Sequence, residues 1–294
     1  MPAFFYLLLP IFFWSGNYIL GRITVSSGID PYSISFLRWS LACLILLPFA
    51  YKKLWQERYI IQKNWPLLVL FGWLGICNYN LFLYIGLTST TVTNAVLLNA
   101  IVPVMILLTA RLLLGSRTTW LQNTGILVST LGAVTIVSRG SLDTLFHLSF
   151  SRGDLWIITA AISWAIYSVM LTKRPQGMSL IGFFTSTAII GTFIQAFPFY
   201  FFGRSEFTDF TIGNWGTIAY MGVFSSIGAF LCWNIGIQKL GAATAGHFIH
   251  LLPVFSILLS VVFLGEQLQS FHYSGIALTF SGIFIATVLN KYRL

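Results

Sequence analysis

The sequence predicts an all-α integral membrane protein in which ten transmembrane helices form two inverted five-helix repeats. Three observations support this fold class. The 294 residues are 57% hydrophobic and only 8% charged, whereas a soluble domain carries about 25% charged residues. Ten apolar windows have the length of about 20 residues that a helix needs to cross the hydrocarbon core. Finally, the chain resembles itself at an offset of 150 residues.

The ten windows are continuous apolar runs, whereas a transmembrane β-barrel needs short segments of alternating hydrophobicity. They end at loop-forming residues such as Gly28-Ile29-Asp30-Pro31 and Lys173-Arg174-Pro175. The first window lacks a basic region and a small-residue cleavage site, so we expect an uncleaved helix there. The predicted spans are residues 3–21, 32–51, 66–87, 92–114, 120–138, 154–172, 179–202, 214–237, 242–264 and 271–290.

The distribution of Lys and Arg predicts that both termini are cytoplasmic. In that orientation eleven of the sixteen basic residues lie in or beside inner loops and four in outer loops, as the excess of basic residues in cytoplasmic loops requires. The net charge of +9 is thereby explained without nucleic acid, and no aromatic-basic recognition pattern interrupts the apolar runs. We expect a multi-pass protein of the cell (inner or plasma) membrane.

The self-similarity divides the chain into predicted repeats at residues 1–140 and 151–290. Proline, tryptophan and glycine pairs share one register, which chance similarity between leucine-rich helices does not produce. The pairs include Pro103/Pro253, Trp14/Trp164, Gly72/Gly222, Gly86/Gly236, Gly125/Gly275 and Gly132/Gly282. Because each repeat has an odd number of spans, the second copy is expected to enter the membrane from the opposite side, as in alternating-access transporters. Residues 97–116 and 247–266 would then face each other across a central cavity.

Several motifs have a familiar pattern: Phe13-Trp14-Ser15-Gly16-Asn17, Phe36-Leu37-Arg38, the two Pro-Val spans, and Gly265-Glu266. Over nearly the whole chain this pattern resembles the drug/metabolite transporter (DMT) superfamily, in particular its EamA-type ten-helix exporters. The first repeat departs from it, with Gly115-Ser116 where the family commonly has Gly-Glu. The resemblance implies that helices 1, 3, 4, 6, 8 and 9 surround the pore and that the cargo is an amino acid or another small metabolite.

Nine residues at membrane depth are predicted to line a substrate-binding cavity. Polar side chains there are costly in lipid and normally face the protein interior or a watery cavity. The alternatives are interfacial belt positions for the aromatic residues, interhelical hydrogen bonds for the asparagines and satisfied structural histidines; a histidine could also relay a proton. The candidates are Trp14, Asn17, Asn78, Asn94, Asn99, Trp164, Tyr167, His247 and His250.

Other residues are predicted to shape the helices. Pro103 and Pro253 should kink their spans, either as static bends or as hinges. Small residues on one face of spans five and ten allow close helix packing inside the chain; a dimer interface is the rival, so the protein is expected to be a monomer or a homodimer. These small residues are Gly125, Gly132, Gly275 and Gly282.

Arg38 is the one strong charge inside a span. It lies about seven residues from the outer end, so it could snorkel to the surface or pair with Asp30 or Glu266, and structural anchoring is favoured over substrate contact. All seven acidic residues lie in loops or at span ends. Proton or sodium coupling, if any, would therefore use histidine, and a phosphate-bearing cargo is disfavoured because it would need several cavity Arg or Lys.

Together these features predict a carrier for small neutral or zwitterionic metabolites, most of all an amino-acid exporter that works by alternating access. Its partners would be the small-molecule substrate and the lipid bilayer. The alternatives are an exporter of drugs or other metabolites with the same fold, an intramembrane enzyme, or a passive pore. An enzyme is disfavoured because no HExxH, G-x-S-x-G or membrane-depth carboxylate pair occurs. We expect no cofactor, and two histidines with no nearby Cys or carboxylate are too few for a metal.

Overall fold

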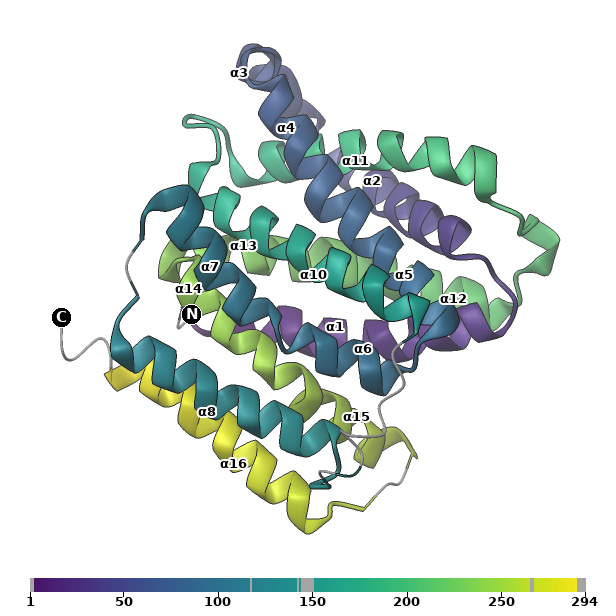
Figure 1. Cartoon of the computed structure of the whole chain (residues 1–294). Helices are drawn as coiled ribbons and strands as arrows, with labels where there is room; N and C mark the ends of the chain where they lie inside the picture. Colours follow the sequence, from purple (N-terminus) through teal and green to yellow (C-terminus); the bar gives the residue numbers. More distant parts are fainter. Residues whose placement is uncertain (1–2, 117, 142, 144–150, 265–266, 290–294) are drawn as a thin grey trace.

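The computed structural model describes residues 3–116, 118–141, 143, 151–264 and 267–289. Gly265, Glu266 and residue 290 of the second predicted repeat lie outside the described residues. Every regular element in the described part is a helix (Figure 1). The first half contains α1 (Phe5–Ser26), α2 (Pro31–Gln56), α3 (Arg58–Lys63), α4 (Trp65–Phe71), η1 (Gly72–Asn78), α5 (Tyr79–Ser89), α6 (Val92–Asn99), α7 (Val102–Leu114) and α8 (Trp120–Val137).

The second half repeats this order of elements. It contains α10 (Arg152–Met170), η2 (Leu171–Lys173), α11 (Leu180–Phe202), η3 (Phe207–Asp209), α12 (Ile212–Tyr220), η4 (Met221–Gly228), α13 (Ala229–Leu240), α14 (Ala242–Phe248), η5 (Ile249–Leu251), α15 (Leu252–Leu264), α16 (Ser270–Phe284) and η6 (Ile285–Leu289). The all-α membrane fold predicted from the sequence is confirmed. Within the described residues, nine helical runs are long and apolar enough to cross a membrane. The first predicted span, α1, has 22 residues but is less apolar because it contains Ser15, Asn17 and Arg22.

The third, fourth, eighth and ninth spans have interior irregularities that recur at the 150-residue offset, whereas the π-helical end of the tenth span, η6, has no counterpart in α8. The π-helical segments η1 and η4 interrupt the third and eighth predicted spans at equivalent places. The fourth span breaks at Ala100 and Ile101, between α6 and α7, and the ninth tightens into η5. Both breaks come directly before a proline, Pro103 or Pro253, which lacks an N–H and whose ring clashes with the carbonyl four residues earlier.

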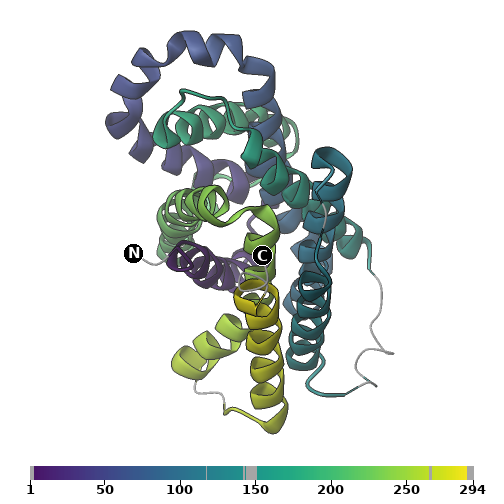
Figure 2. The same ribbon diagram turned by 90° about the vertical axis from the view of Figure 1, so that its left-hand side faces the viewer.

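Equivalent helices of the two halves pack against each other at both ends of the molecule. Figures 1 and 2 show α2 beside α11 at one end and α8 beside α16 at the other. Between these pairs, the first helix of each half packs mainly against helices of the other half. The helix α1 packs on α13 and α15, and α10 packs on α5 and α7. The two halves therefore share one core instead of forming two separate domains.

The pair α8–α16 is held at backbone distance by the glycines that the sequence singled out. A Cβ atom on Gly132 would lie 2.5 Å from the amide nitrogen of Thr279 and 2.7 Å from the carbonyl oxygen of Gly275. On Gly282 it would lie 2.5 Å from the carbonyl oxygen of Gly125. The glycine faces are thus occupied by a contact inside the chain, which leaves them no room for the rival dimer interface.

Two carboxylates join the ends of α2 and α11. Asp30, which caps the N-terminus of α2, accepts hydrogen bonds from the backbone N–H groups of Ser33 and Ser205, each at 2.9 Å. At the other end, the Glu57 carboxylate accepts from the Ser179 N–H at 3.0 Å, at the N-terminus of α11. Each loop that carries one of these acids is thereby tied to the other half of the chain.

We expect Gly132→Ala to destabilise the protein by about 1–3 kcal/mol, because the added methyl group meets backbone atoms that cannot rotate away. Gly216→Ala is the matched control: Gly216 also lies in a helix, but its Cβ would meet nothing within 4 Å, so the change should be neutral or slightly stabilising. Thermal unfolding of the two purified variants in detergent measures the difference. Equal melting temperatures would contradict the close packing of α8 on α16.

The Asp30 link should depend on pH. Burial alone raises the pKa of Asp30, but hydrogen bonds from Ser33 and Ser205 outweigh it and hold the pKa below its ordinary value. When the pKa of a carboxyl group is lower in the folded than in the unfolded protein, the charged group stabilises the fold. This stabilisation is fully present above the unfolded pKa of about 3.9 and is lost as the pH falls toward and through the folded pKa. We therefore expect Asp30→Ala to lower stability by about 1–2 kcal/mol at pH 7, with the loss shrinking below about pH 4.

Melting curves of wild type and Asp30→Ala at pH 7, 5 and 3.5 test this dependence. Asp209→Ala is the control, because Asp209 is exposed and its carboxylate accepts from Glu206 within its own short turn. A loss for Asp30→Ala that does not change with pH would show that the carboxylate charge has no part in the link.

Candidate functional site

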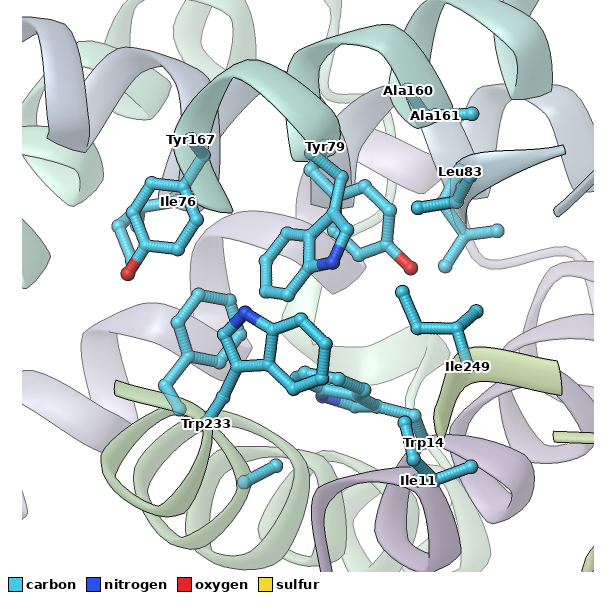
Figure 3. Packing of buried hydrophobic residues seen from close by; sticks show 14 of the residues in the cluster. Ile11, Trp14, Ile76, Tyr79, Leu83, Ala160, Ala161, Tyr167, Trp233 and Ile249 are labelled. Atoms are coloured by element: carbon cyan, nitrogen blue, oxygen red, sulfur yellow. The ribbon is translucent and has the colours of Figure 1, made fainter. Parts of the chain in front are cut away.

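Six aromatic side chains meet at the centre of the molecule and form what we call the central aromatic cluster. Figure 3 shows Trp14, Tyr79, Tyr167 and Trp233 of this cluster converging from four helices. The ring of Trp164 lies 4.6 Å from that of Tyr79 and 5.7 Å from that of Trp233, measured between centroids. All six side chains are buried. The members are Trp14, Tyr79, Trp164, Tyr167, Phe230 and Trp233.

Trp14 and Trp164, which are equivalent in the two halves, contact each other directly. Their ring centroids are 5.0 Å apart and the rings are nearly perpendicular, at 86°. Because the two residues are equivalent, their contact marks a point at which the two halves of the chain meet through the same position of each repeat. The indole N–H of Trp14 donates to the carbonyl oxygen of Ser225 at 3.1 Å, so the buried ring has its polar atom satisfied.

The π-helical segments lie directly beside this cluster. Ser225, which accepts from Trp14, is in η4. In η1, a Cβ atom on Gly75 would lie 2.5 Å from the ring of Tyr167, so only glycine lets the ring lie on the backbone. Such π-helical turns inside α-helices are frequent at functional sites. Both irregular segments therefore adjust the backbone where the rings of the opposite half approach.

A second pair of equivalent residues, Ala100 and His250, meets where the fourth and ninth spans break. The His250 Nε2 atom is 3.0 Å from the carbonyl oxygen of Ala100. Because a carbonyl only accepts, Nε2 carries the proton of this contact, and Nδ1 lies 2.7 Å from the Ser129 hydroxyl oxygen. His250 thus joins α6, α8 and η5, which is the bonding that the structural-histidine alternative expected.

His247 has a different environment. It is fully buried in α14, and neither ring nitrogen has a hydrogen-bond partner among the described residues. The preceding Gly246 lies against Ile106 and Pro103 of α7. A buried polar group without a partner costs stability, so His247 keeps the role of a candidate for binding or proton relay.

Asn17 and Tyr167 take part in the same interhelical contact in the two halves, with the residue types exchanged. The Tyr84 hydroxyl donates to Asn17 Oδ1 at 2.9 Å, which joins α1 to α5. At the offset of 150, the Asn234 amide lies 3.5 Å from the Tyr167 hydroxyl and joins α10 to α13. A comparison of the halves that searches for identities misses such an exchanged pair.

Arg38 is bound to this first pair. It is fully buried, so of the possibilities raised for it, snorkelling to the surface does not occur. Its Nε donates to the Ser226 hydroxyl at 2.6 Å, and its Nη1 donates to Asn17 at 3.0 Å and to the Tyr84 hydroxyl. It does not pair with Asp30, whose carboxylate is engaged in the link between α2 and α11; Glu266 lies outside the described residues.

The remaining sequence candidates are more dispersed. Asn78 is buried at the end of η1, and Asn99 is buried at the end of α6, directly before the break. Asn94 is half-buried in the first turn of α6, where its N–H donates to the Thr91 side chain. The structure therefore gathers Trp14, Trp164 and Tyr167 at one place, with Asn17 beside them, while Asn94 belongs to a helix start.

A pocket of about 420 Å³ opens between α6, α8, α15 and α16. Its apolar wall includes Val96, Ile136 and Pro253, and its polar lining includes Arg139, Ser256 and Gln269. The pocket lies at the C-terminal end of α8 and reaches the proline of the ninth span. None of the nine sequence candidates lines this pocket.

Several residues of the site were missed from the sequence. Phe230, Trp233 and Tyr79 gave no repeat signal because their equivalents at the 150-residue offset are not aromatic. Tyr84 and Asn234 could have been found from the exchanged Asn/Tyr pair. Ser226 carries no signal of its own, because serine in an apolar span has many structural explanations.

Ser129 and Thr279 allow a matched test of the His250 contact, because they are equivalent in the two halves. Ser129→Ala leaves Nδ1 of buried His250 without its partner and should cost about 1–3 kcal/mol. The Thr279 hydroxyl has no partner among the described residues, so Thr279→Val should be neutral or stabilising. Thermal unfolding in detergent distinguishes them, and a smaller loss for Ser129→Ala than for Thr279→Val would refute the assigned bond.

Comparisons with known proteins agree with this architecture. The model of the EamA-like transporter family matches residues 1–138 and again residues 151–288. The uncharacterized transporter YyaM of Bacillus subtilis (strain 168) is 28% identical over 276 residues, which cover 94% of this chain and 90% of the relative. A probable terminal-alkyne amino-acid exporter of Streptantibioticus cattleyicolor is 24% identical, over 95% of this chain and 91% of that protein. A solved crystal structure that is 20% identical superposes with a TM-score of 0.80, over 99% of this chain and 98% of that one.

Proposed function

The chain belongs to the EamA-like transporter family, and from this premise we propose that it carries small neutral or zwitterionic metabolites, above all amino acids, out of the cell by alternating access. The observation that supports this most directly is the pair of contacts between equivalent residues, Trp14 with Trp164 and Ala100 with His250. Two halves that meet at equivalent residues can exchange their conformations and so open the same centre to either side.

The proposal includes the topology inferred from the sequence. The two repeats, residues 1–140 and 151–290, would enter the cell membrane from opposite sides, with both termini in the cytoplasm. In that orientation the pocket beside Arg139 would open to the outside. The central aromatic cluster would then close the path between this pocket and the cytoplasmic side. The breaks before Pro103 and Pro253 would be the places where the fourth and ninth spans bend when the path opens.

The chemistry of the centre favours an amphipathic cargo. Aromatic rings from four helices offer apolar contact, and Asn17 beside them, with the more dispersed Asn78 and Asn99, would provide amide groups that can bind both a carboxylate and an ammonium. One relative named a probable amino-acid exporter is consistent with such a cargo. An exporter of drugs or other metabolites is the closest alternative, and an intramembrane enzyme or a passive pore would belong to other classes.

Proteoliposomes that contain the purified protein test the carrier directly. We expect uptake of a labelled amino acid to rise several-fold when the vesicles are preloaded with the same unlabelled solute, because a carrier returns faster when loaded. The panel should include neutral, acidic, basic and aromatic amino acids at fixed pH. Uptake that is unaffected by preloading would favour a pore, and chemical conversion of the solute would favour an enzyme.

Variants of the candidate site test its position. Trp164→Ala and His247→Ala should each reduce transport at least tenfold, because both side chains are fully surrounded at the centre, while Asn94→Ala tests a candidate that lies at a helix start. Phe193→Ala is the control, since this α11 side chain is 80% exposed on the surface that faces lipid. Unchanged transport by Trp164→Ala, Asn94→Ala and His247→Ala would place the substrate elsewhere.

A further inference from the structure

Arg38 is a positive charge in the interior of the molecule, and it has no charged partner among the described residues. Its hydrogen-bond partners among the described residues are uncharged: Ser226, Asn17 and Tyr84. The guanidinium also lies over two aromatic rings, with its carbon atom 5.5 Å from the centroid of Trp39 and 5.9 Å from that of Tyr84. A buried charge that lacks an opposite charge is costly, and ionisable residues inside a membrane protein commonly mark the path of a substrate or ion.

One nitrogen of the guanidinium has no hydrogen-bond partner in the described part of the chain. Its Nη2 atom is buried and has no hydrogen-bond partner among the described residues, whereas Nε and Nη1 are both engaged. The engaged atoms fix the plane of the group through Ser226 of η4 and Asn17 of α1. A guanidinium held in one orientation, with the N–H groups of one nitrogen unpaired, can donate a charge-assisted hydrogen bond to a carboxylate.

The free donor lies close to the central aromatic cluster. Asn17 follows Trp14 by one helical turn on α1, and the ring of Trp39 packs on that of Phe230 with centroids 5.0 Å apart. An anion bound at Arg38 would therefore have the rings of the cluster beside it to receive an apolar body.

We propose that Arg38 is the anchor for a carboxylate of the cargo, which Nη2 binds while Ser226 and Asn17 hold the guanidinium in place. The cargo would then be a monocarboxylate with an apolar or aromatic body, and organic cations that lack a carboxylate would be excluded. A single guanidinium matches one carboxylate charge, whereas a phosphate would need more cationic groups. The inference rests on the proposed function, because Arg38 is fully buried here and substrate reaches it only when the carrier opens.

Ligand-dependent melting of the purified protein tests the anchor independently of transport. The probes share one body and differ in charge: phenylalanine, 3-phenylpropionate, which has only the carboxylate, and phenethylamine, which has only the ammonium; the leucine series 4-methylpentanoate and isopentylamine is run in parallel. We expect the two carboxylates and the amino acids to raise the melting temperature with saturation, and the amines to have no effect. Chloride is tested at the same concentrations.

The variants separate anchoring from structural support. Arg38→Gln should abolish stabilisation by carboxylates, and Arg38→Lys, which keeps the charge but not the fork, should weaken it about tenfold. Ser226→Ala removes a partner of Nε and should lower the basal melting temperature while the preference for carboxylates persists. Lys63→Gln removes an exposed charge and should change neither property.

The outcomes distinguish this inference from the proposed function. Carboxylate binding in wild type that is lost in Arg38→Gln supports the anchor even if reconstituted vesicles show no transport, in which case the carrier proposal fails alone. Amines that bind as well as acids, stabilisation by chloride and by no carboxylate, or absence of binding by every probe would overturn the anchor. A folded Arg38→Gln that binds carboxylates with unchanged affinity would also overturn it, since Arg38 would then be structural only.

Discussion

Trp14 and Trp164 contact each other because the first helix of each half packs against helices of the other half. This arrangement places α1 against α13 and α15 and places α10 against α5 and α7, so the rings of both halves have to interlock at one point. The surrounding backbone leaves room for this close approach. The segments η1 and η4 are widened, π-helical turns, and Gly75 has no side chain where the ring of Tyr167 lies. The outer pairs α2–α11 and α8–α16 then hold this centre from both sides.

Polar groups follow the same organisation. In a hydrocarbon surrounding, every buried donor and acceptor needs a partner inside the protein, and several of the bonds here join helices of different halves. The Trp14 N–H reaches Ser225, Ser163 reaches the carbonyl of Leu74 at 2.9 Å, and His250 reaches Ala100. Among the described residues, buried side-chain atoms without a partner are spread over the molecule; those on ionisable side chains within membrane-spanning helices are the ring nitrogens of His247 and one nitrogen of Arg38. Groups that are left unpaired in this way are the natural places to expect a substrate or a proton.

The two halves are alike in backbone and unlike in side chains. The breaks before Pro103 and Pro253, the π-helical turns and the glycine contacts recur in both. In contrast, the residue equivalent to Arg38 at the 150-residue offset is Ala188, and the residue equivalent to His250 is Ala100. The shared features determine how the helices pack and bend, and the differences give the centre its charge and hydrogen-bonding groups. A carrier built on such halves would be symmetric in its motion and asymmetric in its choice of cargo.

The sequence by itself determined the membrane class, the helical architecture, the register of the repeat and the family, because hydrophobic length, glycine spacing and proline position are properties of local sequence. It also singled out Trp14, Trp164 and Tyr167, whose type and register are visible without a fold; the structure shows that they are buried together, and their part in binding stays a prediction. Only the tertiary structure decided that Arg38 is buried with Asn17, Tyr84 and Ser226, that His250 is bonded, and that Asn94 stands apart. Those contacts join residues up to 188 positions apart, and the rotation of each helix about its axis, which selects the side chains that meet, is set by packing against neighbours that no single segment encodes.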